Sequence, residues 1–229
     1  MPDPAIRVTI LDDHQGIIDG YLYRLSSASG FEVAATISYG EELEPSLATY
    51  PSDVLLLDIS VPTSAKNPNP YPILYEIPNL LQKYPNLNIL VISMHADRGL
   101  IRAVMEAGAS GYILKDDRAS IQKLGNIVRS IANGGIYFSQ KAHQLMLTQK
   151  TTPSSERLSA RQMEALSLCA AYPDATTAQL AEKMSVSNST VRNLLSGAYV
   201  RLGVHNRTAA IEQARQLGLI TPHSPTPSI

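Results

Sequence analysis

The sequence predicts an α/β doubly wound five-stranded parallel sheet, followed by a smaller all-α domain of four helices that contains a helix-turn-helix. Two observations support this fold class. Over about the first 120 residues, short continuous apolar runs alternate with longer amphipathic stretches, a pattern typical of strands covered by helices on both faces. From Leu158 onward the apolar residues recur only at helical spacing, in four short segments.

Strands and helices alternate in the first part of the chain. The strands are expected at Ile6–Leu11, Phe31–Thr36, Val54–Leu57, Ile89–Ile92 and Tyr112–Leu114. The helices are expected at Gly16–Ser26, Glu41–Thr49, Ile73–Lys83, Arg98–Ala107 and Ser120–Asn133. Strands that alternate with helices in this way favour one parallel sheet between two helical layers.

The domain boundaries follow from these elements. We expect the first domain over residues 1–135 and a partly helical linker over residues 136–155. The second domain is expected over residues 156–220, with a flexible tail over 221–229. Within the linker, Ile136–Thr148 is expected to form one more helix, and the polar stretch Thr151–Ser155 contains a proline, as linkers often do.

Composition limits the class of protein. Apolar residues make up 44% of the 229, which allows a packed core without metals or disulfides. Cys169 is the only cysteine, which excludes an intrachain disulfide framework and fits a reducing compartment. We interpret it as a small core residue rather than a reactive thiol. No signal peptide and no run of about 18 apolar residues is found, so we expect a cytoplasmic protein without a membrane partner.

The formal net charge of −1 conceals a difference between the two parts. Residues 1–149 hold 11 Lys and Arg against 15 Asp and Glu, whereas residues 150–229 hold 8 against 5. An excess of basic residues in 150–229, joined to an acidic part at 1–149, indicates nucleic acid as a partner of the smaller part.

Acidic and basic side chains follow the predicted strands. Because ligands of doubly wound sheets bind beyond the carboxyl ends of the strands, these side chains are expected to converge. Carboxylates that converge repel one another, and Mg²⁺ relieves that repulsion through oxygen ligands. An aspartate can also act as a nucleophile toward phosphorus, with a lysine and a hydroxyl holding the phosphoryl oxygens. The candidates are Asp12, Asp13 and His14 after the first strand, Asp58 after the third, Ser93 after the fourth and Lys115 after the fifth.

These residues carry a family resemblance. Four motifs resemble the receiver domain of two-component response regulators, and the resemblance covers about residues 5–135. They are DDH at 12–14, DVLLLD at 53–58, VIS at 91–93 and EAGASGYILKD at 106–116. The resemblance implies a flavodoxin-like strand order and Asp58 as phospho-acceptor. It also implies Mg²⁺ held by Asp12 or Asp13, Asp58 and the carbonyl of Ser60. Ser93 and Lys115 would contact the phosphoryl group, and Tyr112 matches an aromatic switch position, although an ordinary strand-end tyrosine fits equally.

The chain after Asp58 departs from that family. The stretch from Ile59 to Pro72 lacks the usual Asp-Gly, is longer by about six residues and contains four prolines, which oppose helix and strand alike. This loop could cover the pocket and slow phosphate loss, obstruct the metal, or be a harmless surface insertion. Pro78 is expected to shorten or kink the third helix.

The second domain contains a helix-turn-helix pattern. Leu158–Ala171 is expected to be a helix with Ser159 as N-cap, and Thr177–Met184 a second helix. A turn at Ser185–Ser187 then leads to a helix at Thr190–Leu202, capped by Asn188 or Ser189. The second helix of such a unit enters the major groove of double-stranded DNA with its N-terminal side chains. Here these are Ser189, Thr190, Arg192, Asn193 and Ser196, which can meet bases or phosphates.

A second resemblance covers about residues 156–220. Two stretches are similar to the LuxR-type output domain of the NarL/FixJ regulators. They are LSARQMEAL and QLAEKMSVSNSTVRNLLSGAYVRLGVHNRTAAI. This implies that Arg192, Asn193 and Ser196 line the base-reading face, that Arg207 and Thr208 lie near the DNA backbone, and that Ala198–Leu202 belongs to a dimer contact. Gln162 and Leu194 depart from the usual Glu and His of that family.

The leading hypothesis is therefore a DNA-binding response regulator, in which a sensor histidine kinase phosphorylates Asp58 and a homodimer forms on a two-fold DNA site. It would not be a turnover enzyme. A second hypothesis keeps DNA binding but replaces phosphorylation by control through a ligand or partner protein. A third, a phosphate-ester hydrolase, lacks support because Ser60 stands where such enzymes carry a second aspartate. The remaining histidines, including His95, show no metal-binding spacing.

Overall fold

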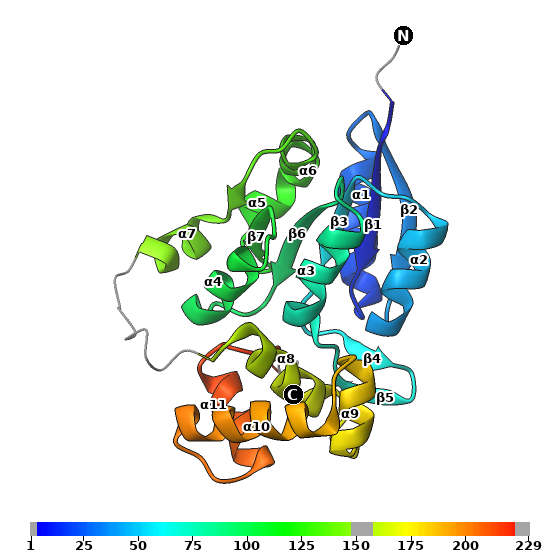
Figure 1. Cartoon of the computed structure of the whole chain (residues 1–229). Coiled ribbons are helices and arrows are strands. Elements are labelled where there is room, and N and C mark those ends of the chain that lie inside the picture. Colours follow the sequence, from blue (N-terminus) through cyan, green and yellow to red (C-terminus); the bar gives the residue numbers. More distant parts are fainter. Residues whose placement is uncertain (1–3, 148–157, 223–229) are drawn as a thin grey trace.

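The structure is a computed structural model, and it describes residues 4–147 and 158–222 (Figure 1). An α/β domain is followed by a helical domain, as the sequence predicts. The expected linker at Thr151–Ser155 lies outside the described residues, and so does the expected tail beyond residue 222. Within the described ranges, no helix has the length and apolar character needed to cross a bilayer.

The main sheet has the strand order β2-β1-β3-β6-β7-β8, and all of its pairs are parallel. Parallel pairing needs a crossover between strands, and the intervening helices provide it. The first five strands match the prediction to within one residue at each end. They are β1 Ile6–Leu11, β2 Phe31–Ile37, β3 Val54–Leu57, β6 Asn88–Ser93 and β7 Gly111–Leu114.

Two apolar clusters cover the two faces of the sheet. On one face pack α1 (Gln15–Ser26) and α6 (Leu124–Ala132). On the other face pack α2 (Leu43–Thr49), α3 (Ile73–Lys83) and α4 (Arg98–Glu106). The four side chains of β3 are all buried because helices lie above and below them. This explains why that strand is a continuous apolar run.

Three helix predictions need correction. The expected helix Glu41–Thr49 begins with a 3₁₀ turn, η1 (Gly40–Glu42), before α2. The expected helix Ser120–Asn133 consists of α5 (Arg118–Gln122) and α6, because Lys123 leaves helical geometry with φ −100° and ψ 15°. Pro78 does not shorten α3, which spans the whole expected segment.

The segment after α6 adds a sixth strand to the expected five. Gly134 turns the chain with φ +82°, and β8 (Tyr137–Phe138) then pairs with β7. An edge strand has free backbone groups, and β8 satisfies those of β7. The expected helix Ile136–Thr148 is therefore wrong over its first residues, and the helix that follows, α7, spans Gln140–Leu147. Ala142 of α7 is fully buried against the sheet. The first domain therefore continues its packing beyond residue 135.

The proline-rich stretch after Asp58 forms a hairpin, which corrects the expectation that it opposes strand structure. Strands β4 (Pro62–Ser64) and β5 (Asn67–Pro70) pair antiparallel in a separate two-stranded sheet. Proline is tolerated on edge strands, where no neighbour needs its missing N–H. Thr63 Oγ1 also donates to the carbonyl of Asn69 at 2.8 Å, which ties the two strands together.

The helical domain encloses its own core. It consists of α8 (Ala160–Ala171), α9 (Thr177–Lys183), α10 (Asn188–Leu202) and α11 (Arg207–Gln216). Ser159 caps α8 as expected and forms a capping box with Gln162. The cap of α10 is Ser187 rather than Asn188 or Ser189, because its side chain accepts from Thr190 N. Cys169 is a buried free thiol in this core, as the sequence predicts.

Candidate functional site

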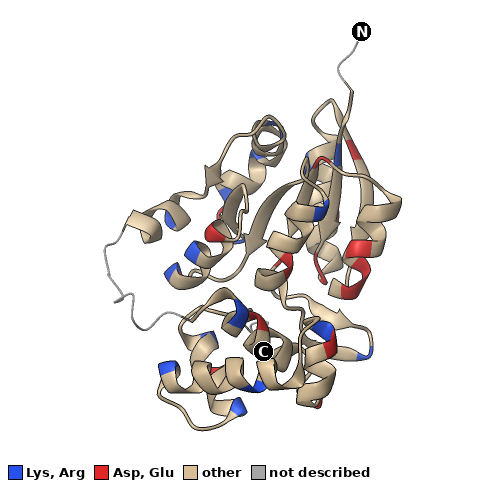
Figure 2. Cartoon of the chain, in the orientation of Figure 1, with Lys and Arg blue, Asp and Glu red and all other residues tan. Residues whose placement is uncertain are grey.

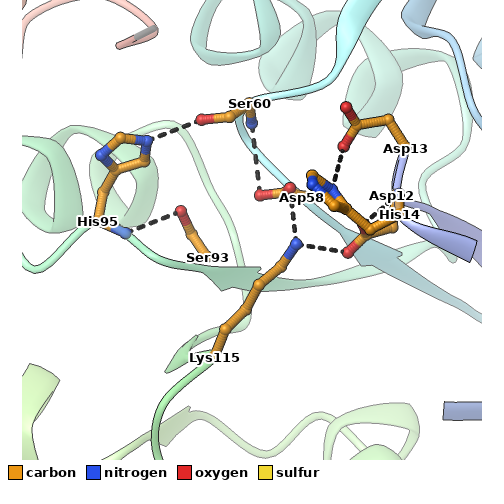
Figure 3. A network of polar contacts seen from close by, with 8 residues as sticks. All are labelled: Asp12, Asp13, His14, Asp58, Ser60, Ser93, His95 and Lys115. Carbon is orange, nitrogen blue, oxygen red and sulfur yellow. Dashed lines mark hydrogen bonds and ion pairs between the residues drawn. The ribbon is translucent and has the colours of Figure 1, made fainter. Parts of the chain in front are cut away.

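Two buried carboxylates lie at the carboxyl ends of neighbouring strands (Figure 3). Asp12 follows β1 and Asp58 follows β3, and they are only 2% and 5% exposed. The parallel ladder fixes their positions, since Asp12 N donates to the carbonyl of Ile37 at 3.1 Å and Asp58 N to that of Leu11 at 2.8 Å. The sheet therefore brings together two acids that stand 46 positions apart in the chain.

Lys115 lies between the two carboxylates. Its Nζ is 2.6 Å from Asp12 Oδ2 and 2.8 Å from Asp58 Oδ2, and Figure 3 shows it reaching up from β7. Burial lowers the pKa of Lys115, but the two carboxylates more than offset this, so the net shift is upward. Burial raises the pKa of Asp12, Asp58 raises it further, and Lys115 opposes both. The lysine thus compensates charges that would otherwise be costly to bury.

Asp13 and His14 form the exposed rim of the pocket. His14 Nδ1 lies 2.7 Å from Asp13 Oδ1, and His14 N donates to Asp12 Oδ1 at 3.0 Å. One ligand atom from each of these three residues lies within 4.8 Å of the others. Asp12 Oδ2 pairs with Lys115 Nζ at 2.6 Å, and Asp13 adds a second, more exposed carboxylate beside it. The oxygen-rich donor set fits Mg²⁺.

A hydroxyl and a histidine border Asp58 on the other side. Ser60 N donates to Asp58 Oδ1 at 3.4 Å, and Ser60 Oγ lies 2.7 Å from His95 Nε2. His95 N in turn donates to Ser93 Oγ at 3.2 Å. Burial lowers the pKa of His95, although Asp58 and Asp97 raise it. His95 was not expected at the site; its position two residues after Ser93, the last residue of β6, is the signal that could have placed it there.

Tyr112 lies behind this loop. Its ring is fully buried, and its hydroxyl donates to the carbonyl of His95 at 2.7 Å. Burial raises the pKa of Tyr112, so the phenol stays neutral and able to donate. The residue is therefore more than a strand-end tyrosine, since it holds the backbone of the loop that borders the pocket.

The helical domain presents a polar face on α10. The side chains of Val191, Leu195 and Ala198 pack into the core. The opposite face, at the helix N-terminus, carries the five residues expected to read DNA, and all of them are exposed: Ser189, Thr190, Arg192, Asn193 and Ser196. Figure 2 shows basic residues spread over the helical domain and acidic residues gathered on η1 and α2.

The two residues expected near the DNA backbone differ in their surroundings. Thr208 is exposed. Arg207 donates to the carbonyls of Ala175 at 2.8 Å and Tyr172 at 3.0 Å, so its guanidinium already ties α11 to the end of α8. Gln162, the departure from the family pattern, completes the α8 capping box and accepts from Arg201 at 2.7 Å.

Comparison with known proteins agrees with this architecture. The family model described as "response regulator receiver domain" matches residues 8–126, and the model described as "bacterial regulatory proteins, luxR family" matches residues 156–214. The chain is 28% identical to the transcriptional regulatory protein DegU of Brevibacillus brevis, over 94% of this chain and 95% of DegU. It is also 28% identical to the oxygen regulatory protein NreC of Staphylococcus aureus, over 94% and 99%.

Solved structures show the same fold. RcsB of Salmonella enterica serovar Typhimurium bound to promoter rprA, in the presence of the phosphomimetic BeF3-, aligns with a TM-score of 0.63 at 21% identity, over 91% of this chain and 98% of that one. A structure of two RcsB dimers bound to two parallel DNAs aligns with a TM-score of 0.55 at 22% identity, over 91% and 97%.

The fold and the acidic pocket define a receiver domain joined to a helix-turn-helix domain. The chain belongs to the response regulator family, and it is a two-component response regulator of the NarL/FixJ type with a LuxR-type DNA-binding domain.

Proposed function

We propose that Asp58 accepts a phosphoryl group from a sensor histidine kinase and that this controls dimerisation and DNA binding. The observation that carries the proposal is the buried pocket in which Lys115 contacts both Asp12 and Asp58, with Ser93 at the end of the neighbouring strand. These residues supply a nucleophile, a cation and a hydroxyl for one phosphoryl group.

The transfer uses the ionised carboxylate of Asp58. One of its oxygens forms a bond to phosphorus while the bond between phosphorus and the donor nitrogen of the kinase phosphohistidine breaks. Lys115 Nζ, already 2.8 Å from Asp58 Oδ2, and the hydroxyl of Ser93 contact the phosphoryl oxygens. Tyr112 would move with the loop after Ser93, because its hydroxyl donates to the carbonyl of His95.

The pocket would hold Mg²⁺ through oxygen ligands. The proposed ligands are Asp12, Asp13, Asp58 and the carbonyl of Ser60, and the close approach of ligand atoms from Asp12 and Asp13 supports the assignment. A bound Mg²⁺ neutralises carboxylate charge and holds phosphoryl oxygens.

The output domain would bind double-stranded DNA through α10. Five exposed side chains near the N-terminus of α10 do not pack into the core, and side chains in this position reach base edges and phosphates. They are Ser189, Thr190, Arg192, Asn193 and Ser196. Thr208 and Arg207 would lie near the DNA backbone. A homodimer formed through the Ala198–Leu202 region would place two such helices on a two-fold site.

The altered stretch after Asp58 raises the alternative of regulation without phosphorylation. That stretch packs against η1 and α8, and Lys115 lies between intact carboxylates. The structure therefore offers no specific support for that alternative. We further propose that the chain acts in the cytoplasm, beside its kinase and DNA, and that it is not a turnover enzyme.

The test combines phosphorylation with DNA binding. Purified chain is treated with a small-molecule phosphodonor, with and without Mg²⁺, and its dimerisation and affinity for a DNA site selected from random duplexes are measured. The proposal expects phosphorylation to need Mg²⁺ and to raise both dimerisation and DNA affinity. Tight DNA binding whose affinity changes with neither phosphodonor nor Mg²⁺ would support regulation by a ligand or partner instead.

A further inference from the structure

A cavity of about 970 Å³ lies between the receiver and the helical domain. Its walls come from α3 and α4 of the receiver and from α8, α10 and α11 of the helical domain, together with residues that flank these helices. Figure 1 shows α3 and α4 beside the helical domain. Ligand sites are commonly concave, have volumes of about 300–1,000 Å³ and often lie between domains. The residues assigned above to the phosphoryl pocket and to the DNA-reading face of α10 lie outside this cavity.

Both domains contribute apolar side chains to the wall of the cavity. Leu74 and Pro78 come from α3, and Met163 comes from α8. Val200, on α10, and Leu217, at the end of α11, also line the cavity, although they are 79% and 46% exposed. Covering such side chains is favourable, because it removes apolar surface from water. The cavity therefore offers a binding surface to a ligand with an apolar body.

The wall of the cavity also carries more positive than negative charge. Four arginines and two glutamates line it, so its formal net charge is +2. An anion is attracted by such a wall, whereas a cation is repelled. The charged residues are Arg98, Arg102, Glu106, Arg161, Glu164 and Arg201.

Each of the two glutamates is paired with an arginine of its own helix. Glu106 Oε1 lies 2.7 Å from Arg102 Nε on α4, and Glu164 Oε2 lies 2.8 Å from Arg161 Nη1 on α8. A carboxylate that is already paired gives little attraction to a second cation. Among the described residues that line the cavity, the negative charge is therefore compensated, and the ligand expected there is not a cation.

The other two arginines of the wall belong to different domains. Arg98 is the first residue of α4, and Arg201 lies near the end of α10. Arg201 Nη1 donates to Gln162 Oε1 at 2.7 Å. A guanidinium has five N–H donors, so it can keep such a bond and still bind a carboxylate. Arginine is well suited to this role, because its planar fork matches the two oxygens of a carboxylate.

We propose that this cavity binds an amphipathic organic anion. The apolar body of the ligand would lie against Leu74, Val200 and Leu217, and its carboxylate would contact Arg98 and Arg201. The bound ligand would touch both domains of the chain at once. Its binding needs no phosphoryl group on Asp58, so this inference goes beyond the function proposed above and is tested separately from it.

Decanoate is the probe, and it is compared with decanol and decyltrimethylammonium. The three compounds share an apolar chain and differ in the charge of the head group. Equilibrium dialysis against the full chain measures the three affinities, at concentrations where each compound is monomeric. Decanoate is expected to bind about ten-fold more tightly than decanol, because a hydrogen bond to a charged group is worth about 1.5–3 kcal/mol. Decyltrimethylammonium is expected to bind most weakly.

Arg98→Met tests the recognition of the carboxylate. Its matched control is Arg118→Met, because each arginine is the first residue of its helix and follows an aspartate N-cap, Asp97 or Asp117. Arg118 does not line the cavity. Arg98→Met is expected to weaken decanoate binding about ten-fold and to leave decanol binding unchanged. Arg118→Met is expected to match the unsubstituted chain with both compounds.

Val200→Glu tests the apolar wall. Its control is Leu147→Glu on α7, since Leu147 is 67% exposed and lies outside the cavity. Both substitutions place a glutamate at an exposed position of a helix, so both proteins are expected to fold. Val200→Glu is expected to weaken the binding of decanoate and of decanol, and to weaken decanoate more because the new carboxylate repels it.

Three results would overturn the proposal. Decanoate that binds no more tightly than decanol would refute an anion site. Equal decanoate affinity in Val200→Glu and Leu147→Glu would show that the compound binds elsewhere on the chain. If the unsubstituted chain binds no decanoate and self-associates in a way that Val200→Glu abolishes, the apolar wall is a contact between copies of the chain.

Discussion

Ser60 Oγ and His95 Nε2 lie 2.7 Å apart, and this hydrogen bond joins the loop after β3 to the loop after β6. Both loops border Asp58. We expect the bond to limit how far the two loops can separate, and so to limit the access of water to a phosphoryl group on that aspartate.

His95→Ala is therefore expected to shorten the lifetime of the phosphorylated chain. The loss of one hydrogen bond, worth about 1 kcal/mol, corresponds to a rate about five times faster. The measurement is the decay of phosphorylated chain after removal of phosphodonor, and His143→Ala, at an exposed position of α7, is the control. Equal decay in both variants would show that the bond does not protect the phosphoryl group.

Lys115→Met is expected to destabilise the receiver when Mg²⁺ is absent. The side chains of Lys115, Asp12 and Asp58 are 5%, 2% and 6% exposed, so removal of the lysine leaves two buried carboxylates uncompensated. Breaking a buried ion pair costs about 3–5 kcal/mol. Denaturant unfolding with and without Mg²⁺ measures this, and Mg²⁺ should recover more stability in Lys115→Met than in the unsubstituted chain. A loss no larger than that of the exposed Lys123→Met would contradict the account.

Arg192→Ala is expected to weaken specific DNA binding more than non-specific binding. The side chain is exposed at the start of α10, where an arginine contact to a base is worth about 1–3 kcal/mol. Affinities for a selected DNA site and for an unrelated duplex are compared at one salt concentration. Arg118→Ala, on α5 of the receiver, should change neither affinity. An equal loss on both duplexes would reassign Arg192 to a phosphate contact.

Glu76→Gln is expected to stabilise the chain at neutral pH and not at acidic pH. Burial raises the pKa of Glu76 above its ordinary 4.5, and Glu44 and Glu164 raise it further, while Asn79 lowers it. Ionisation is thus harder in the folded state. This cost is absent well below pH 4.5 and complete once the pH exceeds the raised folded pKa.

The gain from Glu76→Gln should be on the order of 1 kcal/mol at pH 8 and should vanish at about pH 3. Denaturant unfolding at the two pH values measures it, with Glu32→Gln, at an exposed position of β2, as control. A gain that is the same at both pH values would exclude ionisation as its cause.

The strands of the main sheet could be predicted because each one is marked by an apolar pattern within a few consecutive residues. Continuous apolar runs such as Val54–Leu57 require cover on both faces, and residues that follow such strands must meet at one edge. Asp12, Asp58, Ser93 and Lys115 were brought together on that reasoning. The structure puts Lys115 in contact with Asp12 and Asp58, and Ser93 is linked to them through His95 and Ser60. Helix caps could also be predicted where a residue suited to capping directly precedes the helix, as Ser159 does before α8.

The rest depended on contacts between distant residues. Strand β8 exists because β7 offers free backbone groups, which the helical pattern of residues 136–148 does not reveal. The hairpin after Asp58 forms although its prolines disfavour strands, and its contacts are with distant residues. Tyr71, at its base, packs on Gly40, and Asn67 donates to the carbonyl of Ala171. His95 was missed because a lone histidine carries no periodic signal, and only the fold places it beside Ser60.

Phosphorylation of Asp58 itself is the most direct test of the account. The unsubstituted chain and Asp58→Asn are incubated with a phosphodonor and Mg²⁺, and the attached phosphoryl group is located by mass spectrometry of proteolytic fragments. The account predicts that the unsubstituted chain carries the phosphoryl group on Asp58 and that Asp58→Asn carries none. Equal phosphorylation of the two proteins, or none in the unsubstituted chain, would contradict it.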